Sequence, residues 1–172
     1  MGNIKNSKYS VQEKHNNLLQ TFTNKKIKNY PIKYNVPSFI SKPVFDDEYV
    51  VLCALSKKKQ KDMPASDALE VIEEVNKEGK IVVLVGVGSD AVNYASQLRE
   101  HGANFIDMVN KTTIPELSAL LKNANRVISV DTGTMHLACA TGVPVVAVFY
   151  DKKGVQNWAP RKEIYNAITI TR

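Results

Sequence analysis

The sequence predicts an α/β fold built on a doubly wound parallel sheet, preceded by an N-terminal helix and an extended linker. From residue 48 onward, apolar stretches of strand length alternate about five times with amphipathic stretches of helix length. The connections between them are short. This alternation is typical of parallel strands joined by right-handed helical crossovers. The 172 residues are enough for one domain with an appendage but are short for two domains.

The N-terminal part of the chain, residues 1–47, differs in composition from the rest. It is rich in Lys and Asn and contains three prolines. One helix is predicted over residues 11–22, because Leu18, Leu19 and Phe22 share one helical face. The remainder of this part is predicted to be extended. It would bury little apolar surface by itself, so we expect it to pack against the domain formed by residues 48–172.

The strands are predicted from short apolar stretches rich in β-branched residues. The stretch 80–85 is almost entirely apolar, as expected for a strand with helices on both faces of its sheet. The predicted strands cover residues 49–55, 80–85, 104–108, 126–130, 143–149 and 167–171.

The helices are predicted from helical spacing of apolar residues and from residues that start or stop a helix. Glycines at 79, 102 and 142 are expected to end three of them, and Pro115 suits the first turn of another. The predicted helices of the domain cover residues 66–78, 90–101, 114–123 and 135–141.

The composition is that of an ordinary globular protein, and it excludes several classes. No apolar stretch approaches the ~20 residues that span a bilayer, and the N-terminus MGNIKNSKYS lacks the hydrophobic core of a signal peptide. A cytoplasmic protein is therefore expected. The net charge of +6 suits an anionic partner. A nucleic-acid partner is not expected, because no basic face interleaved with aromatic residues is present.

The two cysteines, Cys53 and Cys139, lie in apolar stretches and are predicted to be buried free thiols. No spacing of Cys and His resembles a zinc site, so no metal is predicted.

Three loops follow predicted strands, and a parallel sheet places all three at the same edge. The first, residues 56–64, carries a hydroxyl and four lysines, which are good partners for phosphate. Taken alone it is better explained as an exposed basic turn.

The second loop, residues 86–90, has two glycines that allow close approach of a ligand. A NAD site is rejected there, because position 91 is Ala and the turn follows the second strand. Asp90 either caps the next helix or reaches a ribose hydroxyl.

The third loop is the segment Asp131-Thr132-Gly133-Thr134-Met135-His136. Backbone N–H groups at the start of the following helix, two hydroxyls and a glycine together form an anion cradle. The alternative is a well-capped helix, with Asp131 or Thr132 as the cap and His136 merely packed. Taken alone, the segment fits both interpretations equally.

The segment Val130–Ala138 is followed by Gly142–Phe149 and by Trp158-Ala159-Pro160. With Thr112–Leu121 and Lys61–Pro64 upstream, these segments resemble glycosyltransferase family 9, the bacterial lipopolysaccharide heptosyltransferases and their relatives. The resemblance covers approximately residues 11–165, and its Asp-Thr-Gly-x-x-His-Leu-Ala block is specific.

This resemblance implies the C-terminal, Rossmann-like half of a two-domain GT-B fold, which binds the donor nucleotide-sugar. It implies that Lys61 and Asp131 are the catalytic residues, with Lys61 stabilising the leaving diphosphate and Asp131 shaping the site. It also implies a set of substrate-binding residues. These are Ser56 for the phosphates, Asp90 for the ribose, Met108 and Thr112 near the base, Thr132, Gly133 and Thr134 around the diphosphate, and His136 shaping the site.

The resemblance further implies transfer of a heptose-like sugar from a nucleotide diphosphate donor, expected to be ADP-linked, with no cofactor. The acceptor would be lipopolysaccharide or another cell-surface glycan, and the protein would lie in the cytoplasm or peripherally at the inner face of the cytoplasmic membrane.

The sequence also departs from the family pattern. Ser56-Lys57-Lys58-Lys59 replaces the family's Gly/Ser-rich phosphate turn, and Met63 stands where Trp is usual. The family's N-terminal domain, which binds the acceptor and supplies the base, and its C-terminal tail have no counterpart in these 172 residues. The alternative function is therefore a truncated, non-catalytic nucleotide-binding module that needs a partner domain.

Overall fold

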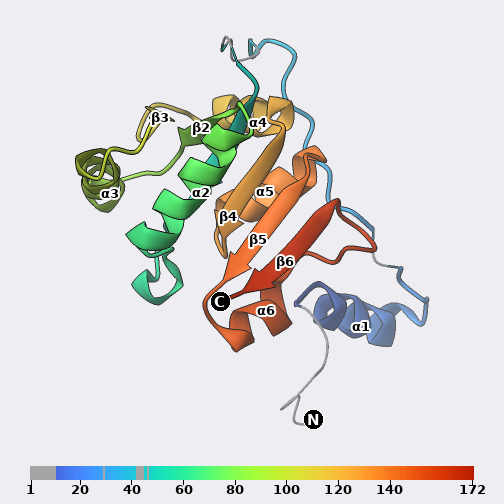
Figure 1. Cartoon of the computed structure of the whole chain (residues 1–172). Helices are drawn as coiled ribbons and strands as arrows, with labels where there is room; N and C mark the ends of the chain where they lie inside the picture. The colour runs from blue at the N-terminus through green and yellow to red at the C-terminus, as the bar shows by residue number, and fades with distance from the viewer. Residues whose placement is uncertain (1–10, 29, 42–44, 46) are drawn as a thin grey trace.

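A computed structural model of the chain describes residues 11–28, 30–41, 45 and 47–172 (Figure 1). Residues 1–10, on which the argument against a signal peptide rests, lie outside this described part. In chain order the elements are α1 (Val11–Thr23), β1 (Tyr49–Cys53), the 3-10 helix η1 (Lys59–Lys61), α2 (Ala65–Lys77), β2 (Ile81–Leu84), α3 (Ser89–Glu100), β3 (Phe105–Asp107), α4 (Ile114–Asn123), β4 (Arg126–Val130), α5 (Gly133–Thr141), β5 (Val145–Phe149), α6 (Lys152–Trp158) and β6 (Ala167–Thr171).

The strands form one parallel sheet in the order β3-β2-β1-β4-β5-β6. From β1 the chain adds β2 and β3 on one side, then crosses to β4 and adds β5 and β6 on the other. The strand order therefore switches between β1 and β4, and ligands bind beyond the carboxyl ends of the strands at such a point. The predicted doubly wound parallel sheet is confirmed.

Helices cover both faces of this sheet. Val50 and Leu52 of β1 face the layer that contains α2 and α3, whereas Val51 and Cys53 face the layer that contains α4 and α5. Figure 1 shows α2 in front of the sheet and α5 behind it. All residues of β1 are buried, as expected for a central strand between two helical layers.

Helix ends follow the local sequence where that sequence carries a strong signal. α4 has its predicted bounds, because Thr113 and Glu116 form a capping box and Pro115 lies in the first turn. Gly142 ends α5 in the left-handed conformation, with φ of 84°.

The helix α6 was not predicted. Its sequence, KKGVQNW, has no helical apolar stripe and contains a glycine. Its start is instead fixed by Asp151, whose side chain accepts a hydrogen bond from the N–H of Gly154. The glycine lets the capping carboxylate approach the helix start closely, because a Cβ at position 154 would lie 2.9 Å from the Asp151 carboxylate oxygens.

The N-terminal helix α1 contacts the domain through its polar residues. Lys14 Nζ donates to Asn157 Oδ1 at 3.2 Å, and Glu13 pairs with Arg161. Farther along, the N–H of Ile32 donates to the Tyr165 hydroxyl at 3.1 Å. The expected packing of this part against the domain is thus present, and Figure 1 shows α1 near α6 and β6.

The predicted apolar face of α1 does not make this contact. Leu18, Leu19 and Phe22 are 55%, 50% and 80% exposed. Helical spacing predicted the helix correctly, but the Glu13 ion pair and the Lys14 hydrogen bond in its first turn decide which side faces the domain.

Both cysteines are buried free thiols, as predicted. Within the described ranges, none of the helices combines the length and hydropathy needed to traverse a bilayer.

Candidate functional site

The loops that follow β1, β2 and β4 lie next to one another at one edge of the sheet, because these three strands are neighbours and run parallel. The sequence placed three candidate loops at this edge, and the structure brings them together there.

The loop after β1 is held in shape by its own hydrogen bonds. The N–H of Ser56 donates to Asp62 Oδ1 at 2.7 Å, and the Ser56 hydroxyl accepts from the N–H of Lys58 at 3.0 Å. Met63, where the family usually has Trp, is buried, and its N–H donates to the carbonyl of Ala54 at 2.8 Å. The loop is therefore anchored at both ends. The Ser56 hydroxyl, predicted to meet a phosphate, already has a partner within the loop.

Lys61 is directed by this loop toward the end of β4, where it forms an ion pair with Asp131. The two side chains are only 15% and 7% exposed, so the pair is largely withdrawn from water. Each charge then depends on the other, because an unpaired charge in such a place is strongly unfavourable. The sequence nominated both residues, but only the fold shows that they meet.

The start of α5 leaves space for a ligand. Thr132 stands at the N-cap position in an extended conformation, and its side chain makes no capping hydrogen bond. A Cβ at Gly133 would meet nothing within 4 Å. The alternative of a helix capped by the Thr132 side chain is therefore wrong, and Asp131 is engaged with Lys61. The first turn presents backbone N–H groups, the arrangement that binds anions at helix N-termini.

Thr134 lies near the Cys53 thiol at the end of β1. Burial raises the pKa of Cys53, and the neighbouring hydroxyls of Thr134 and Ser129 oppose the increase. Thr132, in contrast, stands at the helix start with a side chain that makes no capping hydrogen bond.

His136 lies one turn into α5, and its ring packs edge-on against Trp158 with centroids 5.9 Å apart. Partial burial of the ring lowers the pKa of His136. The nearby Asp131 carboxylate opposes this shift, and Lys61 adds to it. The imidazole is therefore neutral at pH 7, suited to hydrogen bonding rather than to charge pairing with a phosphate.

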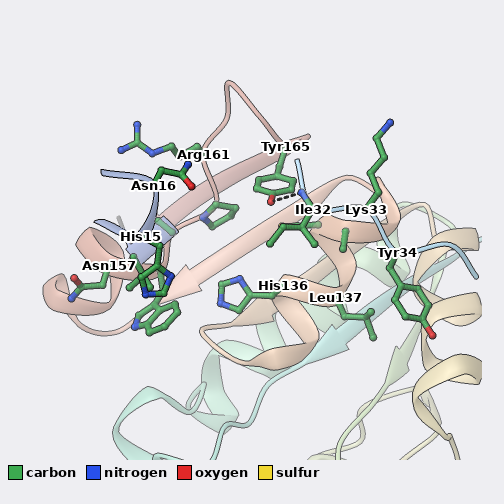
Figure 2. A pocket seen from close by; sticks show the side chains of 16 residues that line it. His15, Asn16, Ile32, Lys33, Tyr34, His136, Leu137, Asn157, Arg161 and Tyr165 are labelled. Carbon is green, nitrogen blue, oxygen red and sulfur yellow. Dashed lines mark hydrogen bonds between the residues drawn. The ribbon is translucent and has the colours of Figure 1, made fainter. Parts of the chain in front are cut away.

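A cavity of about 660 Å³ opens beside His136, between α1, α5 and the end of α6. Figure 2 shows the rings of His15 and His136 directed into the same space, with Leu137 and Tyr34 nearby. Most of its lining is apolar. No sequence pattern indicated this cavity, because its walls come from segments more than 100 residues apart. The nearest available signal was Trp158 in the matched Trp-Ala-Pro segment.

The glycine turn after β2 carries Asp90 into the first turn of α3. Gly88, with φ of 93°, is the N-cap residue, so the proposed capping role of Asp90 is wrong. The Asp90 side chain is exposed and lies 3.8 Å from Lys59 Nζ. It remains available for a ribose hydroxyl.

The loop after β3 contains Met108 and Thr112, the residues predicted near the base. Met108 is half-buried and packs against the core, and Thr112 is half-buried shortly before α4. Sequence reasoning placed the segment from Met108 to Thr113 near the base but did not single out Asn110 within it. Asn110 has φ of 57° and accepts a hydrogen bond from the N–H of Gly88 at 2.7 Å. The available signal was an Asn in a loop, since Asn tolerates the left-handed conformation.

In the described part of the chain, no three His, Cys, Asp or Glu side chains gather as a metal site would require. The chemistry offered at this edge of the sheet is that of anion binding: a partly buried cation, an open helix start and a glycine turn.

Residues 4–171 match the model of the family described as glycosyltransferase family 9 (heptosyltransferase). No curated protein matches the sequence.

Similar solved structures include E. coli heptosyltransferase WaaC with ADP-2-deoxy-2-fluoro heptose, at 22% identity and a TM-score of 0.65, covering 98% of this chain and 52% of that one. E. coli ADP-heptose lps heptosyltransferase II matches at 23% identity and a TM-score of 0.63, covering 73% of this chain and 38% of that one. A family 9 glycosyl transferase from Veillonella parvula matches at 22% identity and a TM-score of 0.61, covering 73% of this chain and 36% of that one. The chain thus spans roughly a third to a half of the length of these proteins. At these identities the likeness shows the fold, that of the Rossmann-like part of GT-B glycosyltransferases.

Proposed function

The chain belongs to glycosyltransferase family 9, the heptosyltransferase family, and from this premise we propose that it is the donor-binding half of a glycosyltransferase. The donor is a nucleotide diphosphate sugar, ADP-linked and heptose-like. The acceptor is lipopolysaccharide or another cell-surface glycan, brought by a partner domain. The reaction takes place in the cytoplasm, peripherally at the inner face of the cytoplasmic membrane.

The observation that carries this proposal is the Lys61–Asp131 ion pair beside the open start of α5. A diphosphate there would accept hydrogen bonds from the N–H groups at Gly133 and Thr134 and from the Thr132 hydroxyl. Lys61 lies close enough to the same helix start to share its charge between Asp131 and the phosphates.

The same groups suit the chemistry of transfer. An acceptor hydroxyl attacks the anomeric carbon, loses its proton to a base and displaces the nucleoside diphosphate. Negative charge then develops on the leaving diphosphate, and a fixed cation and helix N-terminus lower the barrier because they need no reorganisation as that charge grows. Asp131 holds the Lys61 ammonium in position.

The alternative, a nucleotide-binding module without activity of its own, is favoured by the state of the carboxylates at this edge. Asp131 is paired with Lys61, Asp62 accepts from the N–H of Ser56, and Asp107 pairs with Arg99 at 2.9 Å. These three are engaged, and the exposed Asp90 is assigned to the ribose, so the base that deprotonates the acceptor would come from the partner domain. Assay of sugar transfer by the isolated chain separates the two functions.

Calorimetric titration of ADP tests the donor site. We expect binding by the native chain and none by Gly133→Val, whose branched side chain would project into the space proposed for the phosphates. Gly133→Ala, with one methyl group, is the matched intermediate and should weaken binding less.

Both substitutions enter open space at a residue without positive φ, so circular dichroism should show folded proteins. Native protein that is folded but binds no ADP at millimolar concentration would disprove the donor site. Unchanged affinity in Gly133→Val would show that the phosphates lie elsewhere.

A further inference from the structure

Asn110 lies in the loop between β3 and α4 and holds the glycine turn after β2 at two points. Its backbone N–H donates to the carbonyl of Gly86 at 2.9 Å, and its side-chain Oδ1 accepts from the N–H of Gly88 at 2.7 Å. One residue therefore bonds both ends of the three-residue turn, although it lies 22 positions beyond Gly88 in the chain.

Few residue types could form this clamp. Asn110 has φ of 57°, a conformation that most L residues avoid and that Asn and Asp adopt more readily. Glycine would adopt it but would lack the side-chain oxygen. Alanine would lack the oxygen and would be strained as well.

The turn that Asn110 holds tolerates few amino-acid substitutions at its two glycines. Gly88 has φ of 93° and ψ of 176°, a region that is essentially restricted to glycine. A Cβ at Gly86 would lie 2.9 Å from the Cβ of Ala91, so that glycine allows the turn to pack closely on α3. Two glycines make such a turn flexible in the absence of tertiary contacts, and the Asn110 hydrogen bonds remove that freedom.

The turn leads directly into α3, where Asp90 lies exposed in the first turn. The place of Asp90 relative to the start of α5 is therefore set by the turn and by the residue that holds it. The N-cap residue Gly88 has no side chain that could cap α3, and its own N–H is held by the Asn110 side chain.

We propose that Asn110 is a positioning residue for the nucleoside half of the donor. Its hydrogen bonds hold the Gly86–Gly88 turn in the binding conformation in the free protein, so that no conformational entropy is lost by the turn when it and Asp90 contact the ribose. This inference rests on the donor-binding function proposed above. Preorganisation of a loop raises affinity because the free protein has less freedom to lose on binding. The diphosphate cradle at α5 does not depend on this turn.

The test compares ADP with inorganic pyrophosphate, each titrated calorimetrically into native protein, Asn110→Gly, Asn110→Asp and Asn24→Gly. Asn110→Gly keeps the positive φ and removes the oxygen, and should weaken ADP binding about 3- to 10-fold while leaving pyrophosphate affinity within about twofold. Asn110→Asp retains an acceptor and should recover most of the ADP affinity. Asn24→Gly is the matched control, because Asn24 also has positive φ, 52°, but lies at the end of α1.

The NMR signal of the Gly88 amide gives a readout that needs no ligand. Its hydrogen exchange should become faster in Asn110→Gly and return toward the native rate in Asn110→Asp. If native protein binds ADP and Asn110→Gly binds it equally well, or loses pyrophosphate in the same proportion, the positioning role is overturned while the donor site stands. If native protein binds no ADP, the donor site itself fails, and the Gly88 exchange rates still decide whether the clamp exists.

Discussion

At the scale of single residues, the site depends on charges and ring nitrogens whose properties are set by their neighbours. Lys61 and Asp131 are 70 positions apart in the chain, yet each is the partner that makes the other's burial tolerable. His136 is one turn from Gly133, and partial desolvation of its ring, which packs against Trp158, lowers its pKa.

Replacing Lys61 with Met should lower the free energy of unfolding by about 3 kcal/mol, because Asp131 is left buried and unpaired. The double variant Lys61→Met/Asp131→Asn removes both charges and should recover much of that loss. Urea denaturation measures both. Neither variant should bind ADP, since the phosphate cation is gone in each. ADP affinity equal to that of the native chain in the double variant would remove Lys61 from the proposed donor site.

The lowered pKa of His136 predicts how the folding stability depends on pH. Its pKa in the folded state is below the ordinary value of 6.5, so the unfolded chain binds the proton more readily. Folding stability is therefore retained above that value and decreases as the pH falls below it. His136→Gln should reduce the decrease in unfolding free energy between about pH 7 and about pH 5.5. The control is His101→Gln, at the exposed end of α3. An equal effect in both variants would show that the dependence is not specific to His136.

At the scale of elements, local sequence predicts the ends of helices most clearly and the tertiary contacts of helices least clearly. α4 could be predicted residue by residue from Thr113, Pro115 and Glu116. α1 was predicted as a helix, but its orientation is decided by Glu13 and Lys14, which bond partners about 145 positions away. Local sequence contains no information about such partners.

Releasing this contact should free α1 without unfolding the domain. Arg161→Met removes the pairing with Glu13, and because Arg161 is 38% exposed the loss of global stability should be within about 1 kcal/mol. Trp158 is the only tryptophan of the chain and lies in the wall of the cavity beside α1. Its fluorescence should shift to longer wavelength as water enters, and trypsin should cleave near Lys25 and Lys26 more rapidly.

The matched control is Arg99→Met, which breaks the partly exposed pair with Asp107 near the opposite edge of the sheet. It should leave both the fluorescence and the cleavage rate unchanged. Fluorescence identical to that of the native chain in Arg161→Met would mean that α1 is held mainly by Lys14 and by the segment around Ile32.

At the scale of the whole molecule, the sheet is held between two helical layers with separate apolar cores. Strands β1 and β4 are the centre of this arrangement, and their carboxyl ends form the candidate site. Because the site is built where the most buried strands end, its backbone is fixed by the packing of the entire domain.

Phe149 belongs to this packing and should be among the most sensitive positions. It is 1% exposed at the end of β5, so Phe149→Ala should lower the free energy of unfolding by about 3 to 5 kcal/mol. Ile168→Ala on the edge strand β6, where the side chain is 61% exposed, is the control and should change it by about 0.5 kcal/mol or less. Equal losses in urea denaturation would show that β6 is covered in solution.

Much of the fold and part of the candidate site followed from the sequence alone. Apolar periodicity and glycine stops fixed the strands and most helices, because those signals act over a few neighbouring residues. The three strand-end loops could be placed at one edge because parallel strands leave no other arrangement. Residues such as Lys61, Asp131 and Gly133 were nominated through the family resemblance, and their roles remain predictions.

What the tertiary structure alone decided was which of these residues meet. The Lys61–Asp131 pair, the Asn110 clamp on Gly88 and the cavity beside His136 each join segments distant in sequence. Local propensity and spacing describe the chain within about one element, whereas burial and charge pairing depend on strand order and on the helices that cover the sheet. The sequence by itself therefore determined the elements and the edge at which a ligand would bind, and the packing of the complete domain determined the geometry of the site there.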